Sequence, residues 1–515
     1  MRQGKCDQRA EKCWLMPIEI FCRVILGGGS SMEASTELVQ EIVAKIVKEM
    51  SRTEVVTEKK CDCNGGCKGN GSCKSNEDYI FSDVDSAVAA AKQAYKELKK
   101  LSIKDREKII HKIREKCLTY AERLSIMAVD ETGMGRVEDK ITKHILVAEK
   151  TPGTEDLTTT AWSGDGGLTL VEQGPFGVIA AITPSTNPTA TVFCNSIGMI
   201  AAGNSVVFAP HPGAKECTKF AVKLVNEASI EAGGPKNIVV TFDKPSIEMT
   251  SALMNHKDVP FISATGGPGV VKQACSSGKR AIGAGAGNPP VIVDETADIK
   301  AAARDIIDGA TFDNNLPCIA EKEVVAVEQI CDELVEEMQK NGAYLLEDPE
   351  LIKKLVNTVL VRKGDKVTLN RKFVGRDAKV ILDAIGVYVD DSVRCIIFKG
   401  CKNHLLIVEE LMMPILGIVT VKDFEEAVEV AVQLEHGNRH SAHMHSKNID
   451  RLTYFAREVD TAIFVKNAPS YSALGVGAEG YPTFTIASKT GEGLSSAKTF
   501  TKARRCVLKD ALSIK

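Results

Sequence analysis

Short apolar strands alternate with helical segments between residues 176 and 263, and this alternation constrains the fold more than any other feature of the sequence. Each predicted strand is a mostly apolar run, which is typical of strands buried on both faces of a sheet. Strands separated by helices form a parallel sheet, because a parallel connection has to cross over the sheet. We therefore predict an α/β fold with a doubly wound parallel sheet, whose ligands bind beyond the carboxyl ends of the strands. The predicted strands are 176–183, 205–209, 237–241 and 260–263, and the predicted helices are 197–202, 214–232 and 246–254.

A second series of alternating elements follows the first. The chain has 515 residues, more than a single hydrophobic core normally supports, so we expect at least two domains. We place the first domain at 79–287, the second at 288–464, and a return of the chain to the first domain at 465–515. Residues 83–131 are predicted to be helical. In the second domain the predicted helices are 299–310, 327–339 and 349–356, and the apolar stretches between them are 322–327, 395–398 and 416–421.

Charge and cysteine content exclude several classes of protein. The 65 basic and 68 acidic residues leave a net charge of −3, which gives no broad attraction to nucleic acid or to an anionic membrane. No run of 18 uncharged apolar residues occurs, so we expect no transmembrane helix. The 16 cysteines are mostly dispersed, which favours a reduced cytosolic protein over a disulfide scaffold. The cysteines between Cys61 and Cys73 lack the paired spacing of zinc sites, and we interpret residues 51–78 as a flexible linker rich in Cys and Gly.

The first 50 residues divide into two parts. Three glycines at 27–29 precede Met32, as a translated ribosome-binding site would, so we expect Met32 to be the true start and residues 1–31 to be a non-native or mis-annotated extension; a linker scar is the alternative. Within 32–50, residues 36–50 are predicted to be an amphipathic helix, because apolar side chains recur on one helical face from Leu38 to Met50. So short a helix is marginal alone. On a flexible tether it is typical of a docking peptide, although docking on its own chain stays open.

Two glycine-rich segments lie near predicted strand ends. Thr265, Gly266 and Gly267 follow the strand at 260–263 and precede a predicted helix at 270–277. Glycines there let the backbone approach a phosphate, and a helix N-terminus favours negative charge. The segment does not match G-x-G-x-x-G, so alone it is a weak dinucleotide signal. We interpret residues 283–290 as a second close-approach loop, which leads into a strand at 291–294.

Five motifs occur in an order that resembles the aldehyde dehydrogenase superfamily. The resemblance runs from about residue 79 to the C-terminus. It is strongest to the CoA-acylating aldehyde dehydrogenases, especially the propionaldehyde and acetaldehyde enzymes of bacterial microcompartments. It implies a Rossmann-type NAD-binding domain at 79–287 and a second α/β catalytic domain at 288–464. The motifs are Gly174–Pro188, Ala201–Pro210, Thr265–Gly267, Asn314–Cys318 and Glu409–Ile415.

The resemblance assigns a role to individual residues. Cys318 is the expected nucleophile, and the Asn187 amide and the Cys318 backbone N–H are the expected donors to the oxyanion. Glu410 is expected to bind the nicotinamide ribose. The expected ligands are NAD as cofactor, coenzyme A as co-substrate and a short-chain aldehyde as substrate. The expected cofactor-binding residues are Thr183, Pro184, Pro210, His211, Thr265, Gly266, Gly267 and Glu410.

Two departures from the hydrolytic members of the superfamily carry chemical content. Ala284 stands where those members have the glutamate that activates water, which favours a thiol as the second nucleophile and acyl-CoA as the product. Ala209 stands where they have the lysine that grips the adenosine ribose. His211 is the candidate substitute, and the choice between NAD and NADP stays open. The competing hypotheses are a hydrolytic aldehyde dehydrogenase that makes a free acid, and a non-catalytic scaffold that binds shell proteins.

Further expectations concern partners and location. The helix at 36–50 resembles the peptide that directs such enzymes into a shell, so we expect a shell protein or a co-packaged enzyme as its partner, and a cytoplasmic location within a bacterial microcompartment. Segments 166–173 and 497–508 resemble oligomerisation arms, which predicts a homo-oligomer. The histidines between His436 and His445 lack an H-E-x-x-H pattern, so we expect a structural role or contact with CoA, and no metal.

Overall fold

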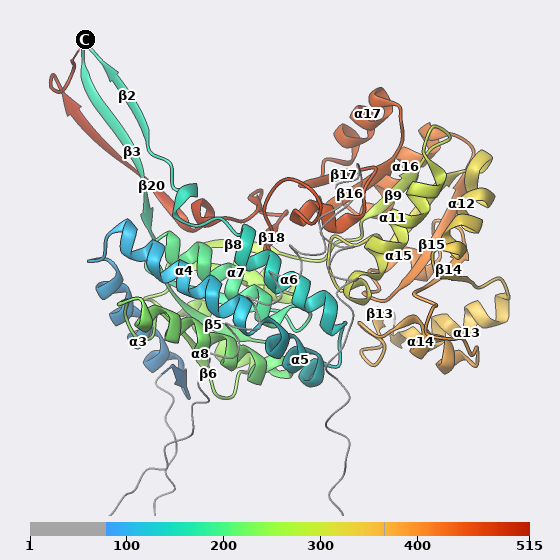
Figure 1. Ribbon diagram of the computed structural model, residues 1–515, viewed down its shortest axis with the longest axis horizontal. Helices are drawn as coiled ribbons and strands as arrows, with labels where there is room; N and C mark the ends of the chain where they lie inside the picture. Colours follow the sequence, from blue (N-terminus) through green and yellow to red (C-terminus); the bar gives the residue numbers. More distant parts are fainter. Residues whose placement is uncertain (1–78, 365, 515) are drawn as a thin grey trace, which may run out of the picture. The chain divides into compact units, whose positions relative to one another are not determined.

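The computed structural model describes residues 79–364 and 366–514. The expected extension at 1–31, the helix at 36–50 and the linker at 51–78 lie outside these residues. The described residues form one compact unit, which contains two parallel sheets and one antiparallel arm (Figure 1).

The first sheet has six strands, all parallel, in the order β1-β6-β5-β4-β7-β8. The order places β4 and β5 at the centre, and every residue of both strands is buried, which explains their apolar sequences. The expected strands are therefore confirmed, and the predicted α/β fold with them. Gly283 and Ala284 correct one expectation, because they belong to β8 and not to a loop. The strands are β1 (Ile80–Phe81), β4 (Val178–Thr183), β5 (Ser205–Pro210), β6 (Val239–Phe242), β7 (Phe261–Thr265) and β8 (Arg280–Ala284).

Among the described residues, eight α-helices belong with the first sheet. Side-chain caps start several of them, as where Ser102 and Asp105 form a capping box at the start of α4. The helix predicted at 197–202 begins earlier in the structure, at Pro188. The sequence did not reveal this start, because α7 is buried on all sides and therefore shows no amphipathic period. The helices are α3 (Val84–Leu98), α4 (Ile103–Thr119), α5 (Ala121–Thr132), α6 (Val137–Lys150), α7 (Pro188–Ala201), α8 (Lys215–Glu231), α9 (Ile247–Asn255) and α10 (Pro268–Cys275).

The second sheet has seven parallel strands in the order β11-β14-β15-β10-β9-β16-β17. Its last strand runs to Lys466, two residues beyond the boundary that we expected at 464. The strands are β9 (Pro290–Val293), β10 (Glu323–Val327), β11 (Ala343–Leu345), β14 (Cys395–Lys399), β15 (Ile415–Val421), β16 (Ser441–His445) and β17 (Ile463–Lys466). The helices are α11 (Ile299–Thr311), α12 (Glu328–Lys340), α13 (Pro349–Val359), α14 (Ala378–Ile385), α15 (Leu405–Val408), α16 (Phe424–Glu435) and α17 (Ile449–Val459). A short hairpin of β12 (Leu360–Lys363) and β13 (Lys366–Leu369) follows α13.

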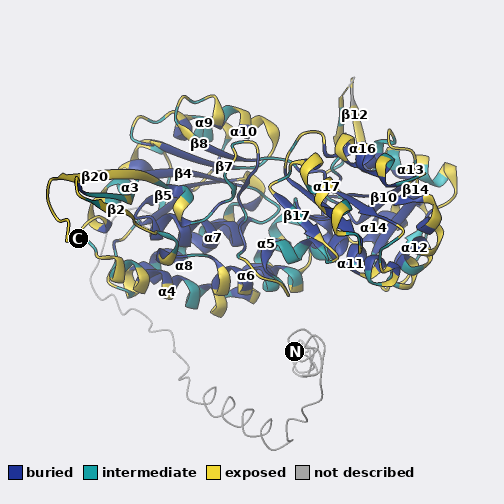
Figure 2. Ribbon diagram, turned by 90° about the horizontal axis from the view of Figure 1, so that it is seen from above, coloured by how far each residue is buried: buried dark blue, intermediate teal, exposed yellow. Residues whose placement is uncertain are grey.

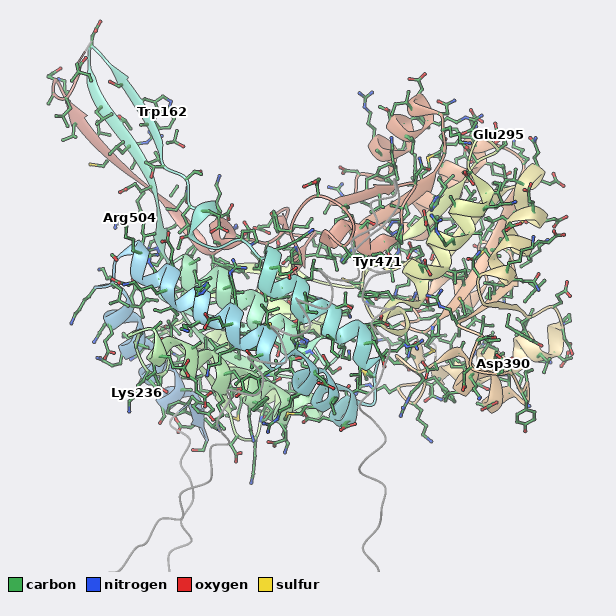
Figure 3. The ribbon with its side chains drawn as sticks, viewed as in Figure 1. Trp162, Lys236, Glu295, Asp390, Tyr471 and Arg504 are labelled. Carbon is green, nitrogen blue, oxygen red and sulfur yellow. The ribbon has the colours of Figure 1, made fainter. Side chains whose placement is uncertain are left out.

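The C-terminal segment returns to the first core and then forms an arm. Ala487, Ala497 and Phe500 pack in the core beneath the first sheet. After Phe500, strand β20 (Thr501–Lys509) pairs antiparallel with β3 (Gly167–Pro175), which also pairs with β2 (Thr160–Gly164). The arm is mostly exposed, whereas both parallel sheets are buried (Figure 2), and Trp162 and Arg504 lie on it (Figure 3). Within residues 79–364 and 366–514, none of the helices combines the length and the apolar character that a membrane span requires.

Candidate functional site

A cavity of about 470 Å³ lies where β4, β5, β7 and β8 end. This is the edge at which a doubly wound sheet binds its ligands. The segment around Cys318 and the segment around Glu410, which belong with the second sheet, complete its lining, and Phe484 and Ile486 from the C-terminal return also contribute. The predicted site residues that line the cavity are Pro184, Asn187, His211, Thr265, Gly266, Gly267, Cys318 and Glu410, and Ala284 lines it as well.

Thr183 and Pro210 each precede a residue that lines the cavity, Pro184 and His211 respectively, and do not line it themselves. They are register partners at the ends of β4 and β5, and both are buried. The Thr183 carbonyl accepts a hydrogen bond from the His211 backbone N–H at 3.2 Å. The two residues therefore hold the turns that carry Pro184 and His211, and do not themselves line the cavity.

Three consecutive residues before Cys318 have a left-handed backbone. The φ angles of Asp313, Asn314 and Asn315 are 49°, 53° and 65°. Asp and Asn tolerate this conformation better than other residues with a Cβ atom. The Asn315 Nδ2 donates to the carbonyls of Ala310 and Glu321, each at 2.9 Å. The run follows the end of α11, which lies at Thr311, and leads the chain to Cys318.

The Asp313 carboxylate is buried and ties this segment to helix α6. Its Oδ2 accepts from Lys140 Nζ at 2.9 Å and from Lys143 Nζ at 2.5 Å, and its Oδ1 accepts from the Arg136 backbone N–H at 2.8 Å. Burial by itself would raise the pKa of Asp313, but the two ammonium groups outweigh it and the pKa is lowered. Asp313 is therefore an ionised group in the interior.

The Asn187 side chain projects from the start of α7. Asn187 is the N-cap residue of this helix, and its carbonyl accepts from the Thr191 backbone N–H at 3.2 Å. Its Oδ1 accepts a hydrogen bond from Lys143 Nζ at 2.7 Å. A helix N-terminus also favours negative charge nearby, so this position suits a developing oxyanion.

The Cys318 thiol is half-buried, and its surroundings disfavour the thiolate. Burial, and then the nearby Glu410 carboxylate, raise the pKa of Cys318 to about 12, while Lys322 and Lys143 act in the opposite direction. A Cβ atom at Gly287 would lie 2.7 Å from the Cys318 carbonyl oxygen and 2.9 Å from Cγ of His440. Only glycine fits there without displacing one of the two.

Two histidines support the backbone around the nucleophile. His440 is buried against Gly287, and burial, with a smaller effect of Lys322, lowers its pKa to about 4. His443 is also buried, and its Nε2–H donates to the Ile319 carbonyl at 2.9 Å. Burial also lowers the pKa of His443, to about 3, so both rings are neutral near pH 7. His436 differs, because it is exposed at the end of α16, where its Nε2 contacts the Val408 carbonyl at 3.0 Å.

Glu410 lies at the same wall as Cys318. Burial raises the pKa of Glu410, and Lys322 and the Gly287 backbone N–H oppose that shift. Lys322 is itself buried and donates to the Asn315 backbone carbonyl at 2.9 Å. Among the residues that the structure describes, no group of three or more His, Cys, Asp or Glu side chains has the arrangement of a metal site.

Sequence reasoning missed two cations of the cavity. Lys143 lies on the buried face of α6, and Arg371 follows the β12–β13 hairpin and lies near His211, whose pKa falls through burial and this positive charge. Arg371 carries no motif that could have revealed it. For Lys143 a signal existed, although the sequence analysis predicted no helix here: Lys140, Lys143 and Val147 have the spacing of one helical face, and lysines on an apolar face need a buried partner.

Comparison with known proteins identifies the family. The model of the aldehyde dehydrogenase family matches residues 77–481. An acetaldehyde dehydrogenase (acetylating) of Salmonella typhimurium is 48% identical over 439 residues, which are 84% of this chain and 93% of that protein. The structure of a propionaldehyde dehydrogenase from the fucose utilisation microcompartment of Clostridium phytofermentans matches with a TM-score of 0.83 and 62% identity, over 85% of this chain and all of that one. A Rhodopseudomonas palustris propionaldehyde dehydrogenase, solved with bound CoA and an acylated cysteine, matches with a TM-score of 0.83 and 52% identity over the same shares. With its family model, its sequence relatives and its fold in agreement, the chain belongs to the aldehyde dehydrogenase family.

Proposed function

We propose that this protein oxidises a short-chain aldehyde, propionaldehyde or acetaldehyde, to the corresponding acyl-CoA with NAD and CoA. The observation that carries the proposal is the set of residues that line the cavity. Cys318 and Asn187 line the cavity together with Ala284, whose methyl group offers no base for activating water. The acetylating and CoA-propanoylating activities of the relatives agree with this assignment.

The residues of the cavity fit a dinucleotide. No atom lies within 4 Å of the place where a side chain would begin at Gly266 or Gly267, which leaves room for a pyrophosphate at the N-terminus of α10. Glu410 would hold the nicotinamide ribose, and Thr183, Pro184, Pro210 and His211 would hold or support the adenosine half. The chemistry that NAD supplies when bound is acceptance of a hydride from the substrate carbon.

Cys318 performs the covalent chemistry. The Cys318 thiol, which its raised pKa keeps protonated at rest, first loses its proton to solvent. The sulfur then attacks the aldehyde carbonyl carbon, and the carbonyl oxygen becomes an oxyanion that Asn187 Nδ2 and the Cys318 backbone N–H stabilise. Once the substrate carbon is oxidised, the acyl group is held on Cys318 as a thioester. The CoA thiol then attacks the acyl carbon, the bond to Cys318 breaks, and the proton of the CoA thiol balances the thiolate that leaves. Because one thioester replaces another, the step is reversible.

A measurement of NADH with and without CoA tests the proposal. Enzyme, NAD and propionaldehyde without CoA should give a burst of about one NADH per active site and then almost none, because Ala284 cannot activate water. Addition of CoA should restart turnover, and Cys318→Ala should abolish both phases. Sustained NADH formation without CoA, with propionate as product, would instead identify a hydrolytic enzyme. No burst with wild-type protein would leave a scaffold as the better description.

We propose further that the protein works inside a bacterial microcompartment as a homo-oligomer. The amphipathic pattern at 36–50, the two arm segments and the microcompartment origin of the Clostridium phytofermentans relative support this. The partner of the helix would be a shell protein or a co-packaged enzyme. Deletion of residues 32–50 should release the protein from purified compartments without changing kcat; co-purification at the wild-type yield would contradict the targeting role.

A further inference from the structure

The Lys143 ammonium group lies inside the protein between two side chains of the site. Lys143 is 1% exposed. Its Nζ donates to Asn187 Oδ1 at 2.7 Å and to Asp313 Oδ2 at 2.5 Å, and it lies 5.4 Å from the centroid of the Phe312 ring. One cation therefore contacts both the residue expected to bind the oxyanion and the segment that carries Cys318.

The contact decides which way the Asn187 amide faces. An ammonium group has donors and no acceptor, so only the oxygen of the amide can face it. The Nδ2 group of Asn187 then has to point away from Lys143, and Asn187 lines the cavity that also contains Cys318. If the Asn187 amide were flipped, its Nδ2 group would face the Lys143 ammonium group, so that donors would meet donors. The Asn187 oxygen would then face the oxyanion.

The Asp313 carboxylate offsets part of the cost of burying this ammonium group, while Lys140 adds a second positive charge beside it. Burial lowers the pKa of Lys143, and the attraction of Asp313 opposes the loss of its proton. Lys140 shares the same carboxylate at 2.9 Å and donates to the Thr186 carbonyl at 3.1 Å. The turn between β4 and α7 is therefore held at two places, by Lys140 through its backbone and by Lys143 through the Asn187 side chain.

We propose that Lys143 is a positioning residue that fixes the Asn187 amide with its Nδ2 toward the oxyanion. This role rests on the proposed function, because it concerns the oxyanion of the aldehyde adduct. Lys143 acts through Asn187, so its effect on the rate should depend on the presence of the Asn187 amide.

A double-mutant cycle on the full-length enzyme tests the dependence. Lys143→Met should lower the kcat of CoA-dependent aldehyde oxidation about 10- to 100-fold, up to the loss caused by Asn187→Ala, because a misoriented donor approaches the cost of a missing one. The KM for propionaldehyde should change less than about threefold, since the ground-state carbonyl gains little from the oxyanion donors. In the Asn187→Ala background, Lys143→Met should lower kcat less than about threefold further. Lys143→Arg, which is also a pure donor, should retain more activity than Lys143→Met.

Lys140→Met is the matched control, because Lys140 shares Asp313 but contacts no atom of the Asn187 side chain. Its effect on kcat should be the same in both backgrounds. If Lys143→Met costs as much without the Asn187 amide as with it, the proposed role is wrong. If Lys143→Met does not fold, Lys143→Gln takes its place in the cycle, and an equal loss of kcat in both Asn187 backgrounds would overturn the role. A wild-type enzyme without CoA-dependent activity would instead refute the proposed function.

Discussion

Gly287→Ala should displace the nucleophile without touching any reacting group. The new methyl carbon would lie 2.7 Å from the Cys318 carbonyl oxygen, and ordinary contact begins at 3.4 Å, so that oxygen has to retreat by about 0.7 Å. The opposite side offers no relief, because Cγ of His440 lies 2.9 Å away and the ring is buried. A displacement of this size in a reacting segment costs about 10- to 100-fold in rate.

The NADH burst in the absence of CoA is the appropriate assay, because it isolates the formation of the thioester. The burst rate of Gly287→Ala should fall by that factor while its amplitude stays near one per active site. Gly285→Ala adds the same methyl group two residues earlier, where no atom lies within 4 Å, and any effect should be limited to the KM of ligands that fill the cavity. A wild-type burst rate in Gly287→Ala would show that the close approach does not position Cys318.

Two further predictions concern buried charges. In the cofactor-free enzyme, alkylation of Cys318 by iodoacetamide should accelerate about tenfold per pH unit from pH 7 to 9, because the thiolate fraction grows in that proportion below a pKa of about 12. The rate is followed on the peptide that contains Cys318, since other cysteines are exposed, and a plateau below pH 9 would contradict the raised pKa. Asp313→Asn should destabilise the protein by about 3–5 kcal/mol, because Lys140 and Lys143 lose the charge that balances them in the interior. Urea unfolding measures the change, and an unaltered midpoint would argue against an ionised Asp313.

The sequence predicted those helices and strands whose own residues carry a clear hydrophobic pattern. Strands β4 and β5 were predictable because complete burial requires an apolar run. The first half of α7 was not predictable, because a helix that is buried on all sides has no polar face, and its sequence then shows no helical repeat of apolar and polar residues. The sequence favours a loop at Gly283 and Ala284, because glycine and alanine have a weak strand propensity. Pairing with β7 decides their conformation, and that pairing is not encoded locally.

The same distinction applies to the site. Cys318 and Asn187 lie within recognisable segments, so resemblance could suggest both. The roles of Lys143 and Gly287 arise from contacts between segments far apart in the chain, one with Asn187 and Asp313, the other with Cys318. Side chains that act by holding another residue carry no motif of their own, and only a structure brings them beside the group that they hold.

The left-handed run at Asp313, Asn314 and Asn315 sets a practical limit on redesign of the active-site loop. A residue branched at Cβ is strongly disfavoured in this conformation, and Gly, Asn and Asp are the side chains that adopt it most readily. In a saturation library across these three positions, most variants would therefore disfavour the left-handed backbone conformation that the loop requires. A library meant to alter substrate size has a better target in Met134 and Leu316, which line the cavity and lie outside the run.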